Sequence, residues 1–347
     1  MSTYFPEMKK KLGFGLMRLP MNREEVDWEQ TNRMVDAFIS AGFNYFDTAH
    51  LYIKGQSEEA VRKCISSRYQ RDRFLLANKL SSGYFETTEE IRPLIESQLD
   101  ICGVEFFDFF LMHAMGAKSH EKYTQLGAYE IVQEMKAEGK FRHVGFSFHD
   151  KPEVLEQILT DRPEMEFVQL QFNYVDYEDL YVRSRECYEI CRKHGKPVFV
   201  MEPVRGGSLV DLPEDALRLM TDCSPAGYAL RYCAGFEGIE MVLSGMSNME
   251  QMEDNCKVMG DFLPLNQAEH QMIAKVRTMY QAQFRIPCTG CRYCTDGCPA
   301  SIDIPEVFRA VKDKEEIPAF RCVACGQCEK ICPQHLPIRE LLQRIQK

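Results

Sequence analysis

The chain has 347 residues, of which 45% are hydrophobic, 27% charged and 11% aromatic, a composition typical of globular rather than disordered or fibrous proteins. Its formal net charge of −10 argues against a surface that neutralises nucleic acid phosphates. Apolar runs such as residues 106–112 are far too short to span a membrane, and the start of the chain lacks the apolar stretch of a secretory signal. We therefore expect a cytoplasmic protein that binds neither nucleic acid nor membranes.

Short strand-like runs alternate with helical segments through most of the chain. Two helical segments, residues 31–41 and 88–102, carry their apolar residues along one stripe. A basic residue followed by glycine, as in Lys193-His194-Gly195, indicates a helix C-terminus. The expected strands cover residues 12–19, 44–47, 74–79, 107–113, 144–147, 167–173, 197–201 and 239–244.

This alternation predicts a parallel sheet built from βαβ units. Eight such units in about 250 residues fit an α/β fold of the (β/α)8 TIM barrel type. An open doubly wound sheet is the competing arrangement, and it requires Gly-x-Gly-x-x-Gly after the first strand. Here Gly13 and Gly15 are followed by Arg18 where the third glycine is needed. We therefore predict a TIM barrel over residues 1–275.

Polar, titratable side chains close three consecutive strands that are otherwise apolar. Asp47 ends the second expected strand and Tyr52 follows it, Lys79 ends the third and His113 ends the fourth. Chemistry in such barrels gathers at the C-terminal ends of the strands. Each residue alone has an ordinary structural explanation, but the ordered set indicates an active site.

At these positions the barrel resembles the aldo-keto reductase superfamily over roughly residues 10–275, through the motif Asp47-Thr48-Ala49-His50-Leu51-Tyr52 and the following strand ends. The resemblance implies an NAD(P)H-dependent oxidoreductase that acts on a small carbonyl or alcohol substrate. The catalytic tetrad that it implies consists of Asp47, Tyr52, Lys79 and His113.

The residue types suggest how this tetrad would work. A free tyrosine, with a pKa of about 10, is a poor proton donor at neutral pH. We expect the Lys79 ammonium to lower the pKa of Tyr52 and Asp47 to hold Lys79 in place. His113 is expected to donate a hydrogen bond to the carbonyl oxygen as charge develops there.

Contacts to the nicotinamide dinucleotide also follow from the resemblance, with departures from the family pattern. Phe148 stands where the family usually has asparagine, and Gly245 and Gln251 stand where many NADP-dependent members have basic residues. A 2′-phosphate loses charge-assisted partners there, so the choice between NAD and NADP stays open. The implied cofactor-binding residues are Ser147, Gln169, Met201, Gly206, Gly245 and Asn255.

Eight of the fifteen cysteines fall between residues 288 and 332, in two copies of Cys-x2-Cys-x2-Cys-x3-Cys-Pro. In two-cluster ferredoxins three thiolates of such a run bind one [4Fe–4S] cube and the fourth binds the other. One predicted ligand set is therefore Cys288, Cys291, Cys294 and Cys332. The other is Cys298, Cys322, Cys325 and Cys328.

Zinc is the alternative metal, but zinc sites usually combine two separated Cys-x2-Cys pairs. The segment resembles a bacterial-type two-[4Fe–4S] ferredoxin domain with a longer linker, and the composition of residues 307–314 indicates a helix inside that linker. We therefore predict a small α-helical ferredoxin-like domain over residues 276–347. Cysteines outside it, such as Cys187 and Cys191, are expected to serve in packing.

The two halves together predict an oxidoreductase whose clusters relay electrons to or from a flavoprotein or ferredoxin partner. A hydride carries two electrons whereas each cluster passes one, and the sequence contains no persuasive flavin site. Two alternatives stay open: clusters that are purely structural, and a non-catalytic nucleotide-binding redox sensor. The loops after the fourth and seventh strands look short, with residues 114–123 the longest, so an open substrate site is expected.

Overall fold

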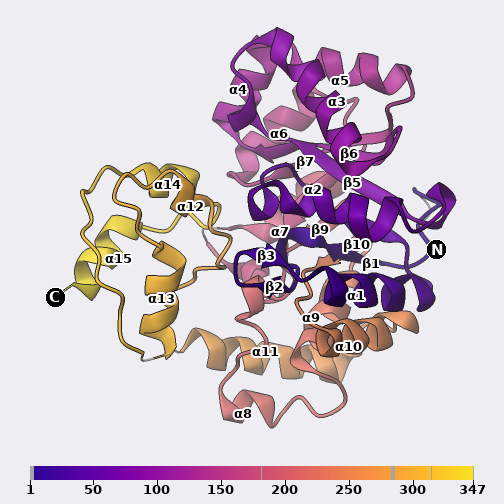
Figure 1. Ribbon diagram of the computed structural model, residues 1–347. Helices are drawn as coiled ribbons and strands as arrows, with labels where there is room; N and C mark the ends of the chain where they lie inside the picture. Colours follow the sequence, from indigo (N-terminus) through magenta and orange to yellow (C-terminus); the bar gives the residue numbers. More distant parts are fainter. Residues whose placement is uncertain (1–3, 181, 283–285, 314, 347) are drawn as a thin grey trace.

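A computed structural model describes residues 4–180, 182–282, 286–313 and 315–346. Eight parallel strands form a closed barrel in the order β1-β10-β9-β8-β7-β6-β5-β4, and a small helical domain lies to one side of it (Figure 1). The predicted (β/α)8 fold and the helical C-terminal domain are both confirmed. Among the described residues no helix is long and apolar enough to cross a membrane.

The barrel strands lie close to the predicted positions. The largest difference is at the first strand, which was expected to reach residue 19 but gives way to a 3₁₀ turn at Leu16–Arg18. A short hairpin, β2 (Met21–Asn22) and β3 (Glu25–Val26), was not predicted. The barrel strands are β1 Leu12–Gly15, β4 Tyr45–Asp47, β5 Leu75–Leu80, β6 Phe107–Met115, β7 Phe141–Phe148, β8 Val168–Gln171, β9 Val198–Met201 and β10 Ile239–Ser244.

Helices surround the barrel and pack their apolar stripes on it. Residues 114–123, expected to be a loop, mostly belong to α4. The helices of the barrel are α1 Trp28–Ser40, α2 Gln56–Ala60, α3 Ile91–Cys102, α4 Ala117–Gln125, α5 Ala128–Ala137, α6 Pro152–Asp161, α7 Ser184–Lys193, α8 Glu214–Leu217, α9 Pro225–Ala234, α10 Met249–Gly260 and α11 Gln267–Gln281. Because α11 runs through residue 275, we propose that the domain boundary lies after this helix rather than at 275/276.

The inside of the barrel is packed with large side chains. Phe167 stacks on Phe199, Phe109 packs against both, and Phe5 of the N-terminal segment packs edge-on against all three. Gly13 is required in this layer, because a Cβ at this position would lie 2.7 Å from a Leu243 carbon. Because these layers are filled, a ligand of the barrel is expected to bind at the carboxyl ends of its strands.

The small domain has its own apolar core of isoleucine, valine, leucine and phenylalanine side chains packed with cysteines. Of residues 307–314, predicted to be helical, 307–313 belong to α13, whose Val307 and Phe308 are buried in this core, and residue 314 lies outside the described residues. Its helices are α12 Tyr293–Asp296, α13 Ile304–Asp313, α14 Gln327–Ile331 and α15 Ile338–Ile345. The domain is thus a folded unit and not an extended tail.

Candidate active site

The pleat of the strands brings the predicted tetrad to one end of the barrel. Side chains two residues apart on a strand point to the same face, and interior Tyr45, Ala77 and Leu111 each precede a polar residue by two positions. Those polar residues are Asp47, Lys79 and His113. Tyr52 comes from a short 3₁₀ turn, Tyr52–Gly55, that follows β4.

Lys79 and Asp47 form a buried ion pair at the centre of this group. The Lys79 ammonium lies 2.6 Å from Asp47 Oδ1 and donates a second hydrogen bond, 2.7 Å long, to the carbonyl oxygen of Thr48. Burial lowers the pKa of Lys79 and raises the pKa of Asp47, while the attraction between the two charges opposes both changes. The pair fixes Lys79 beneath Tyr52, with its Nζ atom 4.8 Å from the centroid of the phenol ring.

The expectation that Lys79 lowers the pKa of Tyr52 is wrong for this structure. Burial raises the pKa of Tyr52 well above its ordinary value, and Tyr293, Asp47 and Glu202 raise it further. Lys79 does not offset them because its ammonium lies over the face of the ring and its hydrogen bonds go to Asp47 and Thr48. Tyr52 is therefore a neutral phenol in this arrangement.

His113 faces Tyr52, with 6.0 Å between the two ring centroids. Burial lowers the pKa of His113 well below its ordinary value, and the charges of Lys79 and His149 act in the same direction. The hydroxyl of Ser81 lies 2.6 Å from His113 Nδ1. If Ser81 donates to Nδ1, the neutral imidazole carries its hydrogen on Nε2 and can donate it to a ligand.

A cleft of about 940 Å³ opens above the tetrad. Asp47, Tyr52 and His113 line it, whereas Lys79 lies fully buried behind them. All six predicted cofactor-binding residues line the same cleft: Ser147, Gln169, Met201, Gly206, Gly245 and Asn255. The volume is in the range of pockets that hold a cofactor or drug-sized molecule.

Several buried polar atoms of cleft-lining residues have no protein partner, which fits a polar ligand. They include Gln169 Oε1, His149 Nδ1 and Thr289 Oγ1. An unpaired amide oxygen at Gln169 suits the amide hydrogens of a nicotinamide, because buried acceptors without a donor cost about 1–3 kcal/mol. Arg18 is the one lysine or arginine among the described residues that line the cleft.

Other predicted cofactor residues already have protein neighbours. Ser147 Oγ accepts a 2.9 Å hydrogen bond from the backbone of Ala114, and Asn255 donates one of 2.7 Å to Ser244. Gly206 is pressed against the cluster domain, since a Cβ there would lie 2.4 Å from the carbonyl oxygen of Thr289. The Gly206 loop is therefore partly covered.

The expectation of an open substrate site is wrong, because the small domain forms one wall of the cleft. The wall residues are Thr289, Cys291, Tyr293, Pro333 and Gln334. Tyr293, in this wall, and Tyr52, on the barrel, line the same cleft. The small domain, much later in the chain, thus supplies a wall of the cleft beside the barrel loops.

The eight clustered cysteines line two small cavities in the sets predicted from their spacing. One cavity is lined by Cys288, Cys291, Cys294 and Cys332, and the other by Cys298, Cys322, Cys325 and Cys328. Among the described residues no three His, Cys, Asp or Glu side chains converge closely enough to hold a single metal ion. Four sulfurs spread around a cavity suit a cube with one thiolate per iron better than one tetrahedral zinc ion.

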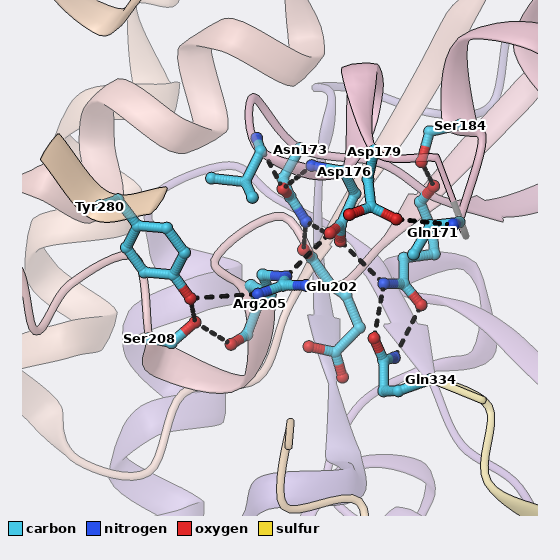
Figure 2. A network of polar contacts seen from close by, with 12 residues as sticks. Gln171, Asn173, Asp176, Asp179, Ser184, Glu202, Arg205, Ser208, Tyr280 and Gln334 are labelled. Atoms are coloured by element: carbon cyan, nitrogen blue, oxygen red, sulfur yellow. Dashed lines mark hydrogen bonds and ion pairs between the residues drawn. The ribbon is translucent and has the colours of Figure 1, made fainter. Parts of the chain in front are cut away.

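A buried polar network joins the small domain to the barrel (Figure 2). Gln171 at the end of β8 and Gln334 exchange two hydrogen bonds, of 3.0 and 2.8 Å. Gln171 also donates to Asp176, which forms a 2.8 Å ion pair with buried Arg205. Arg205 in turn donates to the hydroxyl of Tyr280 on α11. The network connects the segment after Cys332 with the loop that carries Gly206.

Sequence reasoning missed several residues of this site. Ser81 and Gln171 follow Lys79 and Gln169 by two positions, so the strand period offered a signal for both. Tyr293 and Gln334 reach the cleft because the small domain docks on the barrel. No local sequence pattern predicts that docking.

Comparison with known proteins agrees with the architecture. Residues 11–278 match the aldo/keto reductase family and residues 287–336 match a 4Fe-4S dicluster domain. The uncharacterized oxidoreductase YqkF of Bacillus subtilis is 23% identical over 279 residues, which cover 71% of this chain and 85% of that protein.

Two solved structures have the same fold as the barrel. The holo form of aldo-keto reductase AKR11C1 from Bacillus halodurans is 26% identical, with a TM-score of 0.63, covering 78% of this chain and 96% of its own. An aldo-keto reductase from Klebsiella pneumoniae in complex with NADPH is 19% identical, with a TM-score of 0.62, covering 77% and 90%. The chain is therefore a member of the aldo/keto reductase family, an oxidoreductase barrel followed by a 4Fe-4S dicluster domain.

Proposed function

We propose that the barrel catalyses NAD(P)H-dependent reduction of small carbonyl compounds, and the reverse oxidation of alcohols, with Tyr52 as proton donor. The observation that carries this proposal is the single cleft that Tyr52 and His113 share with the six residues expected to bind the cofactor. The nicotinamide, when bound, supplies or accepts a hydride. The Klebsiella relative binds NADPH, which supports the same cofactor class here.

The chain's own residues then have separate tasks. Gln169, through its unpaired Oε1, and Ser147, through its hydroxyl, are suited to orient the carboxamide of the cofactor. His113, kept neutral by burial and oriented by Ser81, donates a hydrogen bond to the substrate oxygen. Tyr52 gives that oxygen its proton, and the Lys79 ammonium, held by Asp47, lies beneath its ring.

A substrate screen tests this proposal. The holoprotein, purified without oxygen, is assayed with NADH and with NADPH against a series of short aldehydes and ketones. Wild type is expected to oxidise the nicotinamide in the presence of at least one carbonyl compound, and Tyr52→Phe is expected to lose at least 100-fold in kcat, the usual contribution of a positioned acid. Tyr69→Phe, far from the cleft, serves as the matched control. Equal activity of the two variants contradicts the assigned role of Tyr52.

For the dicluster domain we propose that the two cysteine sets each hold one [4Fe–4S] cluster and that these relay electrons between the cleft and a flavoprotein or ferredoxin partner. Each cluster supplies single-electron transfer when bound. The proposal is supported by Cys291, which lines both the cleft and the first cavity, and by Ile304, which lines both cavities. Cys325 of the second set is exposed, so the second cluster would lie near the surface, where a flavoprotein or ferredoxin can approach it.

A purely structural role for the clusters is favoured by the contacts between the domains. Gln171–Gln334 and the 2.6 Å hydrogen bond from Arg18 to Thr289 fix the small domain on the cleft. Anaerobic mixing with reduced nicotinamide separates the two roles. Bleaching of the cluster absorption on mixing, followed by its return when an electron acceptor is added, supports the relay, whereas clusters that never change redox state during turnover support the structural role.

A further inference from the structure

Glu58 is a buried carboxylate that lies outside the cleft and takes no part in the mechanism described above. It belongs to α2, which follows the turn that carries Tyr52, and its side chain is fully buried. Ile53 and Lys54 in that turn have left-handed backbones, with φ of 50° and 55°, a conformation that is uncommon for residues other than glycine. This unfavourable turn brings α2 back to β5, where Glu58 is bonded to Asn78.

The carboxylate of Glu58 accepts hydrogen bonds from two side-chain amides that are themselves fully buried. Its Oε1 accepts one of 2.8 Å from Asn78 Nδ2 and one of 3.1 Å from Gln98 Nε2. Its other oxygen, Oε2, lies 2.7 Å from Nδ1 of the partly exposed His50. Because a carboxylate only accepts hydrogen bonds, both amides turn their NH2 groups toward Glu58.

The same two amides hold the main chain of Lys79. Asn78 Oδ1 accepts a 2.8 Å hydrogen bond from the backbone N–H of Lys79, and Gln98 Nε2 donates one of 3.0 Å to the Lys79 carbonyl oxygen. An Asn78 amide turned the other way would present its NH2 group to another donor. Glu58 therefore fixes the orientation of the groups on both sides of Lys79.

The position of this main chain decides where the Lys79 ammonium lies. The ammonium is over the Tyr52 ring, 4.8 Å from its centroid. Ser57, also on α2, shares a 2.7 Å hydrogen bond with the hydroxyl of Thr48, whose carbonyl oxygen accepts from the same ammonium. A displacement of about 1 Å in an active site can cost on the order of 100-fold in rate, even when the substituted residue is far from the chemistry.

We propose that Glu58 is a positioning residue: through Asn78 and Gln98 it sets the main chain of Lys79, and thereby the place of the ammonium beneath Tyr52. The expected effect on rate rests on the proposed function, whereas the position of Lys79 does not depend on turnover. Glu58→Gln keeps a side-chain oxygen that can accept both amide bonds, and Glu58→Met has a similar length but offers only a weak acceptor. The two variants therefore separate the acceptor from simple filling of the space.

The test combines crystal structures with kinetics of the full-length holoprotein, prepared without oxygen. Structures of wild type, Glu58→Gln and Glu58→Met give the distance from Lys79 Nζ to the Tyr52 ring. The kcat and KM values are measured with NADPH and with propanal as the probe aldehyde. Glu59→Met, which removes a 3.1 Å exposed ion pair with Lys63 from the same helix, is the matched control.

Glu58→Met is expected to move the Lys79 ammonium from its place over the ring and to lower kcat roughly 10- to 100-fold, with the KM for NADPH little changed. Glu58→Gln and Glu59→Met are expected to keep both the distance and the rate close to wild type. An ammonium that stays in place in Glu58→Met overturns the proposal at any level of activity. So does an equal loss of kcat in Glu58→Gln and Glu58→Met, because the acceptor for the amides is then not what matters.

Failure of the reductase assignment gives a different result, since Tyr52→Phe then turns over as fast as wild type. In that case the structures of the Glu58 variants still decide whether this carboxylate sets the position of Lys79. If Glu58→Met does not fold, Gln98→Met is interpreted in the same way. It removes the hydrogen bond to the Lys79 carbonyl oxygen and leaves the Glu58 carboxylate bonded to Asn78.

Discussion

The Lys79 ammonium lies over the face of the Tyr52 ring, 4.8 Å from its centroid, and is held there by Asp47 Oδ1 at 2.6 Å. Both members of this ion pair are buried. Removing one charge leaves the other unpaired away from water, which costs about 3–5 kcal/mol in buried pairs. The geometry therefore links the acid chemistry of the site to the stability of the barrel.

The first prediction follows from this pair. Lys79→Met should destabilise the barrel by about 3–5 kcal/mol because the Asp47 carboxylate stays buried without its partner. The double variant Lys79→Met/Asp47→Asn should recover a large part of that loss. Equilibrium urea unfolding followed by circular dichroism measures both. A double variant no more stable than Lys79→Met contradicts the assigned pairing.

A second prediction concerns the contact between the domains. Gln334→Leu removes both hydrogen bonds to Gln171 and leaves buried amide atoms unpaired, at a cost of about 1–3 kcal/mol. The connection between α11 and Cys288 should then be cut faster in limited proteolysis, while Gln343→Leu, at an exposed position of α15, should behave like wild type. Equal cutting rates for both variants count against a docked domain.

The third prediction is a pH dependence of stability. Although burial opposes its charge, the pKa of His143 is raised from 6.5 by Glu166, 3.1 Å from Nδ1, and by Glu7, 2.7 Å from Nε2. A raised pKa in the folded state adds stability that is complete below the unfolded value of about 6.5 and is lost as pH rises through the folded value. The advantage of wild type over His143→Gln should therefore shrink from pH 6 to pH 8.5.

Thermal unfolding of the two proteins across that interval provides the measurement. Groups common to both proteins cancel in the difference, so the trend reports on His143 alone. If the stability difference between wild type and His143→Gln grows with pH, the two carboxylates do not hold a charged imidazole at position 143.

A fourth prediction concerns the end of the cleft at α10, where Gln251 accepts a hydrogen bond from the backbone of Ser247. Gln251→Arg places a cation where the sequence lacks one and should lower the KM for NADPH, relative to NADH, by about 10-fold, the value of one charge-assisted hydrogen bond. Gln251→Met loses the same hydrogen bond without adding charge and should not change the ratio. A ratio unaffected by Gln251→Arg places the 2′-phosphate elsewhere.

The barrel and the residues on its rim could be predicted from the sequence, because they depend on the local periodicity of strands and helices. Strand alternation places Asp47, Lys79 and His113 on one rim, and the same period leads to Ser81. The two cysteine runs predicted their own grouping through their spacing. The docking of one domain on the other could not be predicted from the sequence: Tyr52 and Tyr293 line one cleft although they lie 241 positions apart in the chain.

The most direct measurement of the central claim uses a nicotinamide that carries deuterium at the transferable C4 position. Product alcohol from the wild-type holoprotein is analysed by mass spectrometry after reaction in ordinary water. Hydride transfer in the cleft beside Tyr52 predicts one deuterium on the former carbonyl carbon, retained in every turnover. An alcohol without deuterium means that electrons and protons arrive separately through the clusters and solvent, and it contradicts the reductase mechanism.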